Sequence, residues 1–193
     1  KKDILKNENK SFSPNDYKKD KTTKKKNNYI SLEKLIEESK VKYNNEKRNI
    51  WSVSNKEGFI NPEKIFSHQI ASDDIKNYKK VDKNNFGYNP SRINVGSIAF
   101  NQSNEVGFIS PMYVVFKNKD EKKLNNKYLL YLLKSELGIK KIKEKSIGAV
   151  RNTLKFKNLT NIKIPLPSIE KQNQIVSELD GYQKIINGCR QII

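Results

Sequence analysis

The stretch KIPLPSIEKQNQIVSELDGYQKII, residues 163–186, joins a short apolar strand to a long helix through a Pro-x-Pro step. Ser168 follows the second proline and is a favourable N-cap residue for that helix. Apolar side chains then recur at steps of four and three, which is the spacing of a coiled-coil seam. The seam consists of Ile175, Leu179, Tyr182, Ile186, Cys189 and Ile193. Burial of each Leu or Ile stabilises a contact by about 1.5–3 kcal/mol, so we predict a subunit-interface helix over 168–193.

The residues before this helix, 29–167, mix strand and helix signals in one domain. Strands are predicted within 49–54, 86–101, 105–117 and 161–166, where β-branched and aromatic residues alternate with Pro/Gly turns. A short helix is expected after Ser31, with Leu32, Leu35 and Ile36 on one face, and a long one over 126–143, capped by Asn125. Residues 144–159 read as a loop. The expected fold is α/β (mixed α+β), with a curved sheet flanked by helices and a long coiled-coil-forming helix at its end.

Composition limits the partners and the setting of the chain. Lys and Arg number 39 against 21 Asp and Glu, which gives a formal net charge of +18 and favours a polyanionic partner such as nucleic acid. Residues 1–28 are Lys-rich with few apolar residues, and we expect a linker or tail there. One cysteine permits neither an intrachain disulfide nor a cysteine metal cluster. The sequence shows no membrane-spanning run and no signal peptide, so a cytoplasmic location is expected.

Residues suited to catalysis are sparse. His68 is the only histidine and has no hydrolase-like context, while Cys189 falls on the apolar seam, where a small packing residue is expected. Residues 146–152, SIGAVRN, lack the glycines and the Lys-Ser/Thr ending of a phosphate-binding loop. The acid-Glu-x-Lys arrangement of Asp82 and 121–123 is a chance match in so Lys-rich a chain. We therefore predict no catalytic residues, no metal site and no cofactor bound by this chain.

Polar loops offer the side chains that read DNA. Arg pairs with guanine and Asn with adenine, whereas Lys mostly contacts phosphates. Such residues gather in the turn after the first strand, in 89–97 and in 145–157. The predicted DNA-binding residues are Asn55, Lys56, Asn89, Arg92, Asn94, Ser146, Arg151, Asn152, Thr153 and Lys155. Residues of this type in several loops of a basic chain favour DNA recognition over ordinary polar turns.

These segments resemble the specificity (S) subunit of Type I restriction–modification systems, from about Tyr29 to the C-terminus. The similar segments are WSVSNKEGFINPEKIF (51–66), SDDIKNYKKVDKNNFGYNPSRINVGSIAF (72–100), GFISPMYVVFK (107–117) and KSIGAVRNTLKFKNLTNIKIPLPSIEKQNQIVSELD (145–180). The resemblance implies a target recognition domain over 29–167 that reads one half of a bipartite double-stranded DNA site, followed by a spacer helix over 168–193. It also implies that this component is not an enzyme.

The same resemblance implies the partners. Methyltransferase (M) subunits that use S-adenosylmethionine would dock on the helices, a restriction (R) subunit would join through the complex, and a second S half would pair with the helix; no membrane partner is expected. One recognition domain and one helix leave three contexts open: a half-length S protein, a piece of a full S subunit, or the C-terminal recognition domain of a single-chain methyltransferase/restriction enzyme. A sequence-independent nucleic-acid-binding module and a small nuclease or methyltransferase are the other classes of function considered.

Overall fold

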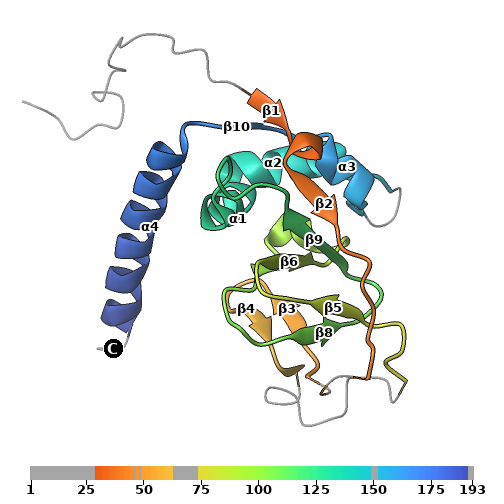
Figure 1. Ribbon diagram of the computed structural model, residues 1–193. Coiled ribbons are helices and arrows are strands. Elements are labelled where there is room, and N and C mark those ends of the chain that lie inside the picture. The colour runs from red at the N-terminus through yellow and green to blue at the C-terminus, as the bar shows by residue number, and fades with distance from the viewer. Residues whose placement is uncertain (1–28, 46, 48, 63–73, 149–151, 191–193) are drawn as a thin grey trace, which may run out of the picture.

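The computed structural model of the chain describes residues 29–45, 47, 49–62, 74–148 and 152–190. The predicted linker 1–28, and with it His68, Arg151 and Ile193, lies outside the described residues. The described residues form the mixed α+β domain that the sequence predicts, and Figure 1 shows a long C-terminal helix standing beside it.

The centre of the domain is a four-stranded antiparallel sheet. Its strands are β2 (Ile36–Glu38), β9 (Val114–Asn118), β6 (Asn85–Tyr88) and β7 (Ile98–Phe100), in the order β2-β9-β6-β7. Aromatic side chains stack across these strands. The Phe86 ring lies with its centroid 4.8 Å from the Phe100 ring and 4.8 Å from the Phe116 ring. Cross-strand aromatic pairs of this kind stabilise a sheet and fix its register.

Three two-stranded sheets extend the fold. The hairpin of β3 (Ser52–Ser54) and β4 (Gly58–Ile60) forms around the predicted turn, where Gly58 adopts a φ of +79°. The strands β5 (Lys79–Val81) and β8 (Gly107–Ile109) pair beside it. The strands β1 (Tyr29–Ser31) and β10 (Lys163–Pro165) join the start of the domain to its exit. The Leu32 N–H also donates to the Ile162 carbonyl at 2.9 Å.

Helices gather at one end of the domain, above the sheets in Figure 1. Among the described residues they are α1 (Asn126–Lys134), α2 (Glu136–Lys145), α3 (Phe156–Thr160) and the single 3-10 turns η1 (Leu32–Lys34) and η3 (Ile93–Val95). The main hydrophobic core lies between these helices and the central sheet. The last helix, α4 (Ile169–Arg190), begins after Ser168 as predicted, with the Lys171 N–H 3.4 Å from the Ser168 hydroxyl oxygen.

Three local predictions need correction. The helix predicted over 126–143 is broken at Ser135, whose hydroxyl oxygen caps α2 by accepting from the Gly138 N–H at 3.1 Å. The segment 144–159, expected to be a loop, contains the end of α2 and all of α3 except its last residue, Thr160. The helix expected after Ser31 is the single turn η1, and Ile36 already belongs to β2. The Ser31 hydroxyl donates to the Thr160 carbonyl at 2.7 Å instead of capping that turn.

Candidate nucleic-acid interface

A groove of about 510 Å³ separates the β3–β4 turn from the 89–97 loop. One wall carries Asn55 and Lys56, both exposed at the turn, and the other carries Arg92, which is exposed on the loop. Asn89 also lines the groove. Four of the predicted DNA-binding residues, which lie far apart in the sequence, are thus brought together around one space. Ser54, Glu57, Ser97 and Tyr113 also line the groove.

The 89–97 loop is held by its own hydrogen bonds. Asn89 is buried, and its side-chain oxygen accepts from the Ser91 N–H at 3.0 Å, while its backbone carbonyl accepts from the Arg92 and Ile93 N–H groups at 3.0 and 2.9 Å. Gly96 closes η3 with a φ of +90°, a conformation that favours glycine. In this arrangement the Asn89 amide shapes the loop, whereas Arg92 is exposed and Asn94 half-buried.

The second predicted loop follows α2. Its ends pair in a short bridge in which Ile147 and Thr153 exchange backbone hydrogen bonds of 3.1 and 3.0 Å. The Ser146 hydroxyl donates to the Ile142 carbonyl at 2.8 Å at the end of α2, and the Thr153 hydroxyl donates to the Ile147 carbonyl at 3.3 Å. Of the predicted DNA-binding residues described in this loop, Asn152 and Lys155 are exposed, whereas Ser146 and Thr153 are half-buried.

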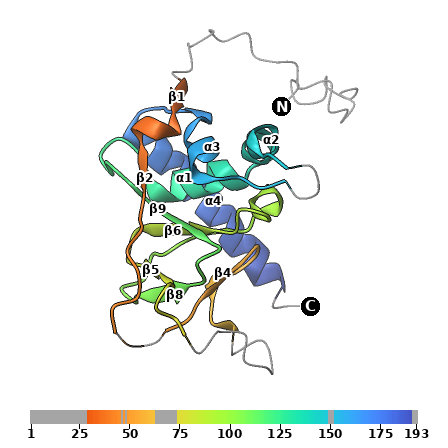
Figure 2. The ribbon, with the colours of Figure 1, turned by 90° about the vertical axis from the view of Figure 1, so that its right-hand side faces the viewer.

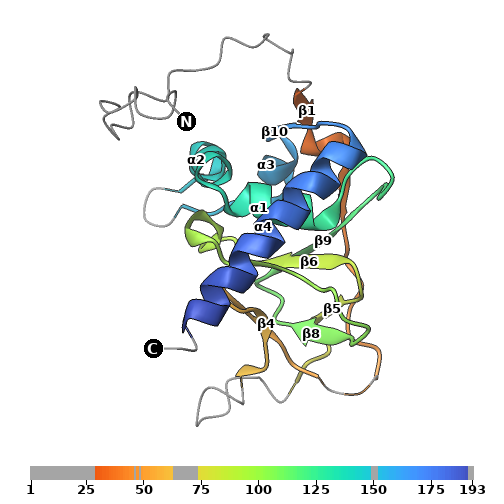
Figure 3. The ribbon, with the colours of Figure 1, turned by 90° about the vertical axis from the view of Figure 1, so that its left-hand side faces the viewer.

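The two loops are joined through Leu154. The Tyr88 hydroxyl donates to the Leu154 carbonyl at 3.0 Å, and the Leu154 N–H donates to the Pro90 carbonyl at 3.0 Å. Tyr88 is fully buried, and burial raises the pKa of its hydroxyl, which keeps it protonated as a donor. In Figures 2 and 3 the end of α2, the 89–97 segment and the β3–β4 hairpin follow one another along one edge of the molecule.

Sequence reasoning missed the groups that support this groove. The Tyr113 hydroxyl lies 3.0 Å from the Ser52 hydroxyl, and the Tyr113 carbonyl accepts from the Lys79 ammonium at 2.5 Å. The Lys134 ammonium, from α1, donates to the Asn55 carbonyl at 3.0 Å. Burial lowers the pKa of both lysines. Only the Pro-Met-Tyr turn between β8 and β9 signalled an ordered tip at Tyr113, and no local pattern signalled the two lysine contacts.

Of the predicted subunit-interface residues on α4, one packs against the domain and the others described are exposed to solvent. Ile175 is half-buried and packs against the main core, and its neighbour Val176, outside the seam, is buried. Farther along the helix the seam is exposed: Leu179 by 38%, Tyr182 by 62% and Ile186 by 47%. Cys189 is exposed as well. The packing role predicted for Cys189 therefore requires a partner chain, and the seam as a subunit interface stays a prediction.

Within the described part of the chain, no group of three or more His, Cys, Asp or Glu residues is placed to hold a metal ion. Asp82 pairs with the Lys80 ammonium at 3.3 Å, and the Glu121 carboxylate accepts from the Asn126 amide at 3.0 Å. Each of these carboxylates thus has a local structural partner. Among the described helices, none combines the length and the apolar character needed to cross a bilayer.

Comparison with solved structures agrees with the fold. The S subunit of a Type I restriction–modification system from M. genitalium superposes with a TM-score of 0.56 at 13% identity, over 84% of this chain and 40% of that one. The HsdS subunit from Thermoanaerobacter tengcongensis gives a TM-score of 0.54 at 18% identity, over 85% and 39%. A chain from a structure described as the basis of complex assembly and conformational transition of the type I R-M system gives 0.53 at 17%, over 85% and 40%.

The present chain thus spans about two-fifths of the length of these structures. No curated protein sequence matches it. The family model of the Type I restriction modification DNA specificity domain matches residues 2–193, which is nearly the whole chain. The family resemblance seen in the sequence is therefore confirmed, and the chain belongs to the Type I restriction–modification DNA specificity domain family, whose role is sequence-specific DNA recognition.

Proposed function

We propose that this chain reads one half of a bipartite double-stranded DNA site for a Type I restriction–modification complex. The observation that carries the proposal is the hydrogen-bonded contact between the 89–97 loop and Leu154, which joins the second polar loop to the loop that lines the groove between Arg92 and Lys56. Because the loops and the groove lie along one edge, a single duplex can contact them together (Figure 2).

The side chains on this edge suit direct readout. Arg92 carries a guanidinium with five donors and no acceptor, which matches the O6 and N7 acceptors of guanine, and Asn55 and Asn152 carry amides that match adenine. Each good base contact contributes about 1–3 kcal/mol of discrimination. We assign phosphate contacts to the exposed Lys56 and Lys155, and such contacts make binding weaken as the salt concentration rises. One half-site bound in this way is weak, and linkage to a second half supplies the remaining affinity.

The exposed seam of α4 supports the assignment of partners. We assign to it the docking of methyltransferase subunits and pairing with a second S half, with a restriction subunit joining through the complex. The chain itself then needs no cofactor, and S-adenosylmethionine belongs to the methyltransferase partner. Replacing Leu179 and Ile186 with Asp places two charges on the seam and should abolish assembly while the domain stays folded. Unchanged assembly in that double variant would exclude the seam as the interface.

Methylation mapping tests the function directly. Genomic DNA from a strain that carries this gene is compared with DNA from the same strain without it. We expect one bipartite methylated motif to be lost when the gene is removed. Competition binding by the reconstituted complex at fixed salt adds a second measurement. Equal affinity for all duplexes would favour a sequence-independent module instead. A motif methylated by a single polypeptide that includes this domain would assign it to a fused enzyme.

A further inference from the structure

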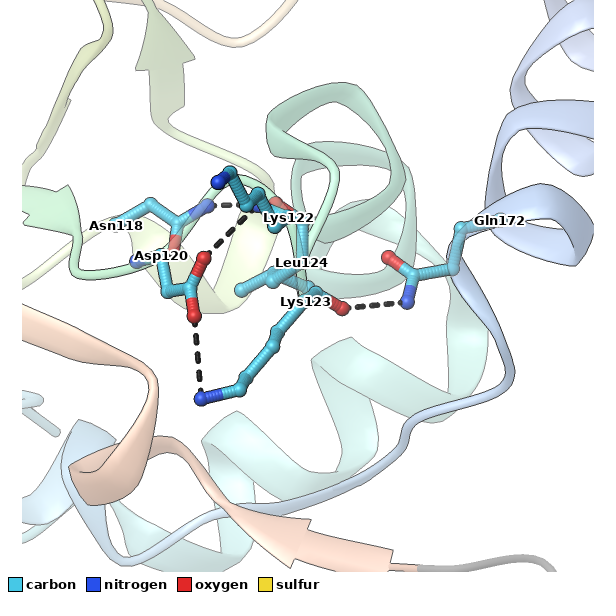
Figure 4. Close-up of polar contacts among 6 residues, drawn as sticks. All are labelled: Asn118, Asp120, Lys122, Lys123, Leu124 and Gln172. Carbon is cyan, nitrogen blue, oxygen red and sulfur yellow. Dashed lines mark hydrogen bonds and ion pairs between the residues drawn. The ribbon is translucent and has the colours of Figure 1, made fainter.

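Gln172 is polar yet fully buried at the root of α4. Figure 4 shows its amide reaching into the turn that precedes α1. Its Nε2 group donates to the Lys123 carbonyl at 2.9 Å and to the Pro167 carbonyl at 2.9 Å, and its Oε1 atom accepts from the Asn125 N–H at 2.8 Å. Leaving a buried amide without hydrogen-bond partners costs folding free energy. These three bonds therefore tie the start of α4 to one orientation.

The turn that holds Gln172 is itself fixed to the central sheet. Asn118, the last residue of β9, donates from Nδ2 to the Leu124 carbonyl at 2.6 Å and accepts at Oδ1 from the Asp120 N–H at 3.0 Å. Asp120 in turn accepts from the Lys122 N–H at 2.9 Å and pairs with the Lys123 ammonium at 3.1 Å (Figure 4). The helix is thus attached to the sheet through a turn with its own closed hydrogen-bond network.

A second anchor lies two helical turns farther along α4. The Asp180 carboxylate pairs with the Lys127 ammonium at 2.6 Å and accepts from the Tyr131 hydroxyl, and both partners belong to α1. Buried Val176 lies between the two anchors, at the i+4 position from Gln172. Gln172 and Asp180 are eight residues apart, about 12 Å along the helix axis. Two anchors on one face fix both the tilt of α4 and its rotation.

Beyond Asp180 the helix is exposed. Residues 181–189 are exposed except for half-buried Gly188, and Figure 1 shows this part of α4 standing away from the domain, in the direction that the two anchors set. The α1 helix that holds Asp180 also holds the β3–β4 turn, because its Lys134 ammonium donates to the Asn55 carbonyl. The interface helix and one wall of the groove are therefore positioned by the same short helix.

From this geometry we propose that Gln172 and Asp180 form a clamp that sets the number of base pairs between the two half-sites. The inference rests on the proposed bipartite function. Arg190, the last described residue of α4, lies ten residues beyond Asp180, which is roughly 15 Å along the helix axis. One base pair adds about 3.4 Å along the duplex, and a tilt of about 13° at Asp180 moves a point 15 Å farther along α4 by this amount. A loosened clamp should therefore relax the spacing and leave the bases read unchanged.

The test uses the complete complex with its methyltransferase partners and a set of duplexes in which fixed half-sites flank spacers of every length. Asp180→Ala removes the second anchor from a half-exposed position, and Gln172→Met removes the first with little change in side-chain size. Glu178→Ala, which removes an exposed carboxylate from the same helix, is the matched control. We expect wild type and control to prefer one spacer length, with lengths one base pair shorter or longer at least tenfold weaker. In the clamp variants those neighbouring lengths should rise to within about threefold of the best.

The possible results distinguish failure of the proposed function from failure of the clamp proposal. If the wild-type complex shows no dependence on the half-site bases, the proposed function fails. If that dependence holds but the clamp variants keep the wild-type length profile, the clamp proposal alone is wrong. A change in the half-site bases that the variants prefer would also overturn the clamp, because a purely positioning role leaves the bases unaffected. Loss of assembly in Asp180→Ala would count against it too, since that carboxylate is proposed to orient α4 and not to hold subunits.

Discussion

Replacing Tyr88 with Phe removes the hydroxyl that joins the two predicted DNA-binding loops. The Leu154 carbonyl then loses its donor at a fully buried position. A lost hydrogen bond together with an unpaired buried acceptor costs about 1–3 kcal/mol. For a chain of this size, 1 kcal/mol corresponds to a shift in Tm of about 2–4 °C. We therefore expect Tyr88→Phe to lower the Tm by roughly 2–12 °C.

Tyr128→Phe is a closely matched control. The Tyr128 hydroxyl also donates to a backbone carbonyl at 3.0 Å, that of Pro165, but away from the loops. Both variants should lose stability by similar amounts in urea unfolding. Only Tyr88→Phe should also weaken the discrimination between the cognate half-site and a single-base variant, roughly threefold or about 0.7 kcal/mol, because only its hydroxyl orders the loops. Equal discrimination in the two variants, measured by competition binding, would refute the claim that Tyr88 organises the interface.

The stability gap between wild type and Tyr88→Phe also has a defined pH dependence. Burial raises the pKa of the Tyr88 hydroxyl in the folded state above its unfolded value of about 10. The stability contributed by this group is therefore fully present below pH 10 and is lost as the pH rises beyond it, where the unfolded chain ionises first. The gap in unfolding free energy should narrow above pH 10, and a gap that widens there would contradict the assignment.

Three further predictions concern other parts of the molecule. Gly107→Ala places a Cβ atom 2.0 Å from Cδ2 of Trp51, so it should lower the free energy of urea unfolding by about 3 kcal/mol. The loss should be smaller when Trp51 is also replaced by Leu, and a larger loss in that background would contradict the clash. Asp180→Asn should be less stable than wild type at neutral pH, because the Lys127 ammonium holds the pKa of the Asp180 carboxyl below its usual value. The stabilisation by this carboxylate is present above about pH 3.9 and is lost as the pH falls through the pKa of Asp180 in the folded state. A difference in unfolding free energy between variant and wild type that stays constant down to about pH 2 would be inconsistent with this ion pair. Arg92→Lys keeps the charge but not the guanidinium, so competition binding should lose about 1–3 kcal/mol of discrimination at one base pair with an unchanged salt slope, whereas a uniform loss across all sequences would indicate a phosphate contact.

Local signals in the sequence were sufficient for the elements whose ends have chemical markers. Ser168 and Asn125 cap their helices as predicted, because capping depends only on residues two or three positions away. The break between α1 and α2 was missed. The apolar pattern continues through Ser135, while a Cβ atom on Gly138 would lie 2.1 Å from the Leu132 carbonyl oxygen, so the two helices meet more closely than periodicity reveals.

The sequence predicts which residue types line the candidate site but not how the loops that carry them are arranged in space. Asn55, Lys56 and Arg92 have the side chains that suit DNA, and they do surround one groove. The joining of the loops through Tyr88 and Leu154 spans 66 positions of the chain and leaves no local pattern. Gln172 shows the same limit more sharply. Within the polar run EKQNQ it reads as a solvent-exposed residue, and only the packing of α4 on the turn before α1 makes it fully buried.

The position of α1 allows the proposed base readout to change while the direction of α4 stays fixed. Lys127, Tyr131 and Lys134 lie at i, i+4 and i+7, so they share one face of α1. Lys127 and Tyr131 bind Asp180 of α4. Lys134 donates to the backbone carbonyl of Asn55 in the β3–β4 turn. That last bond goes to the backbone, so the Asn55 side chain can be exchanged without losing it. Changes of side chain at the groove are therefore compatible with an unaltered direction of α4, whereas changes at Lys127 or Tyr131 act on α4 and leave the proposed base-reading side chains in place.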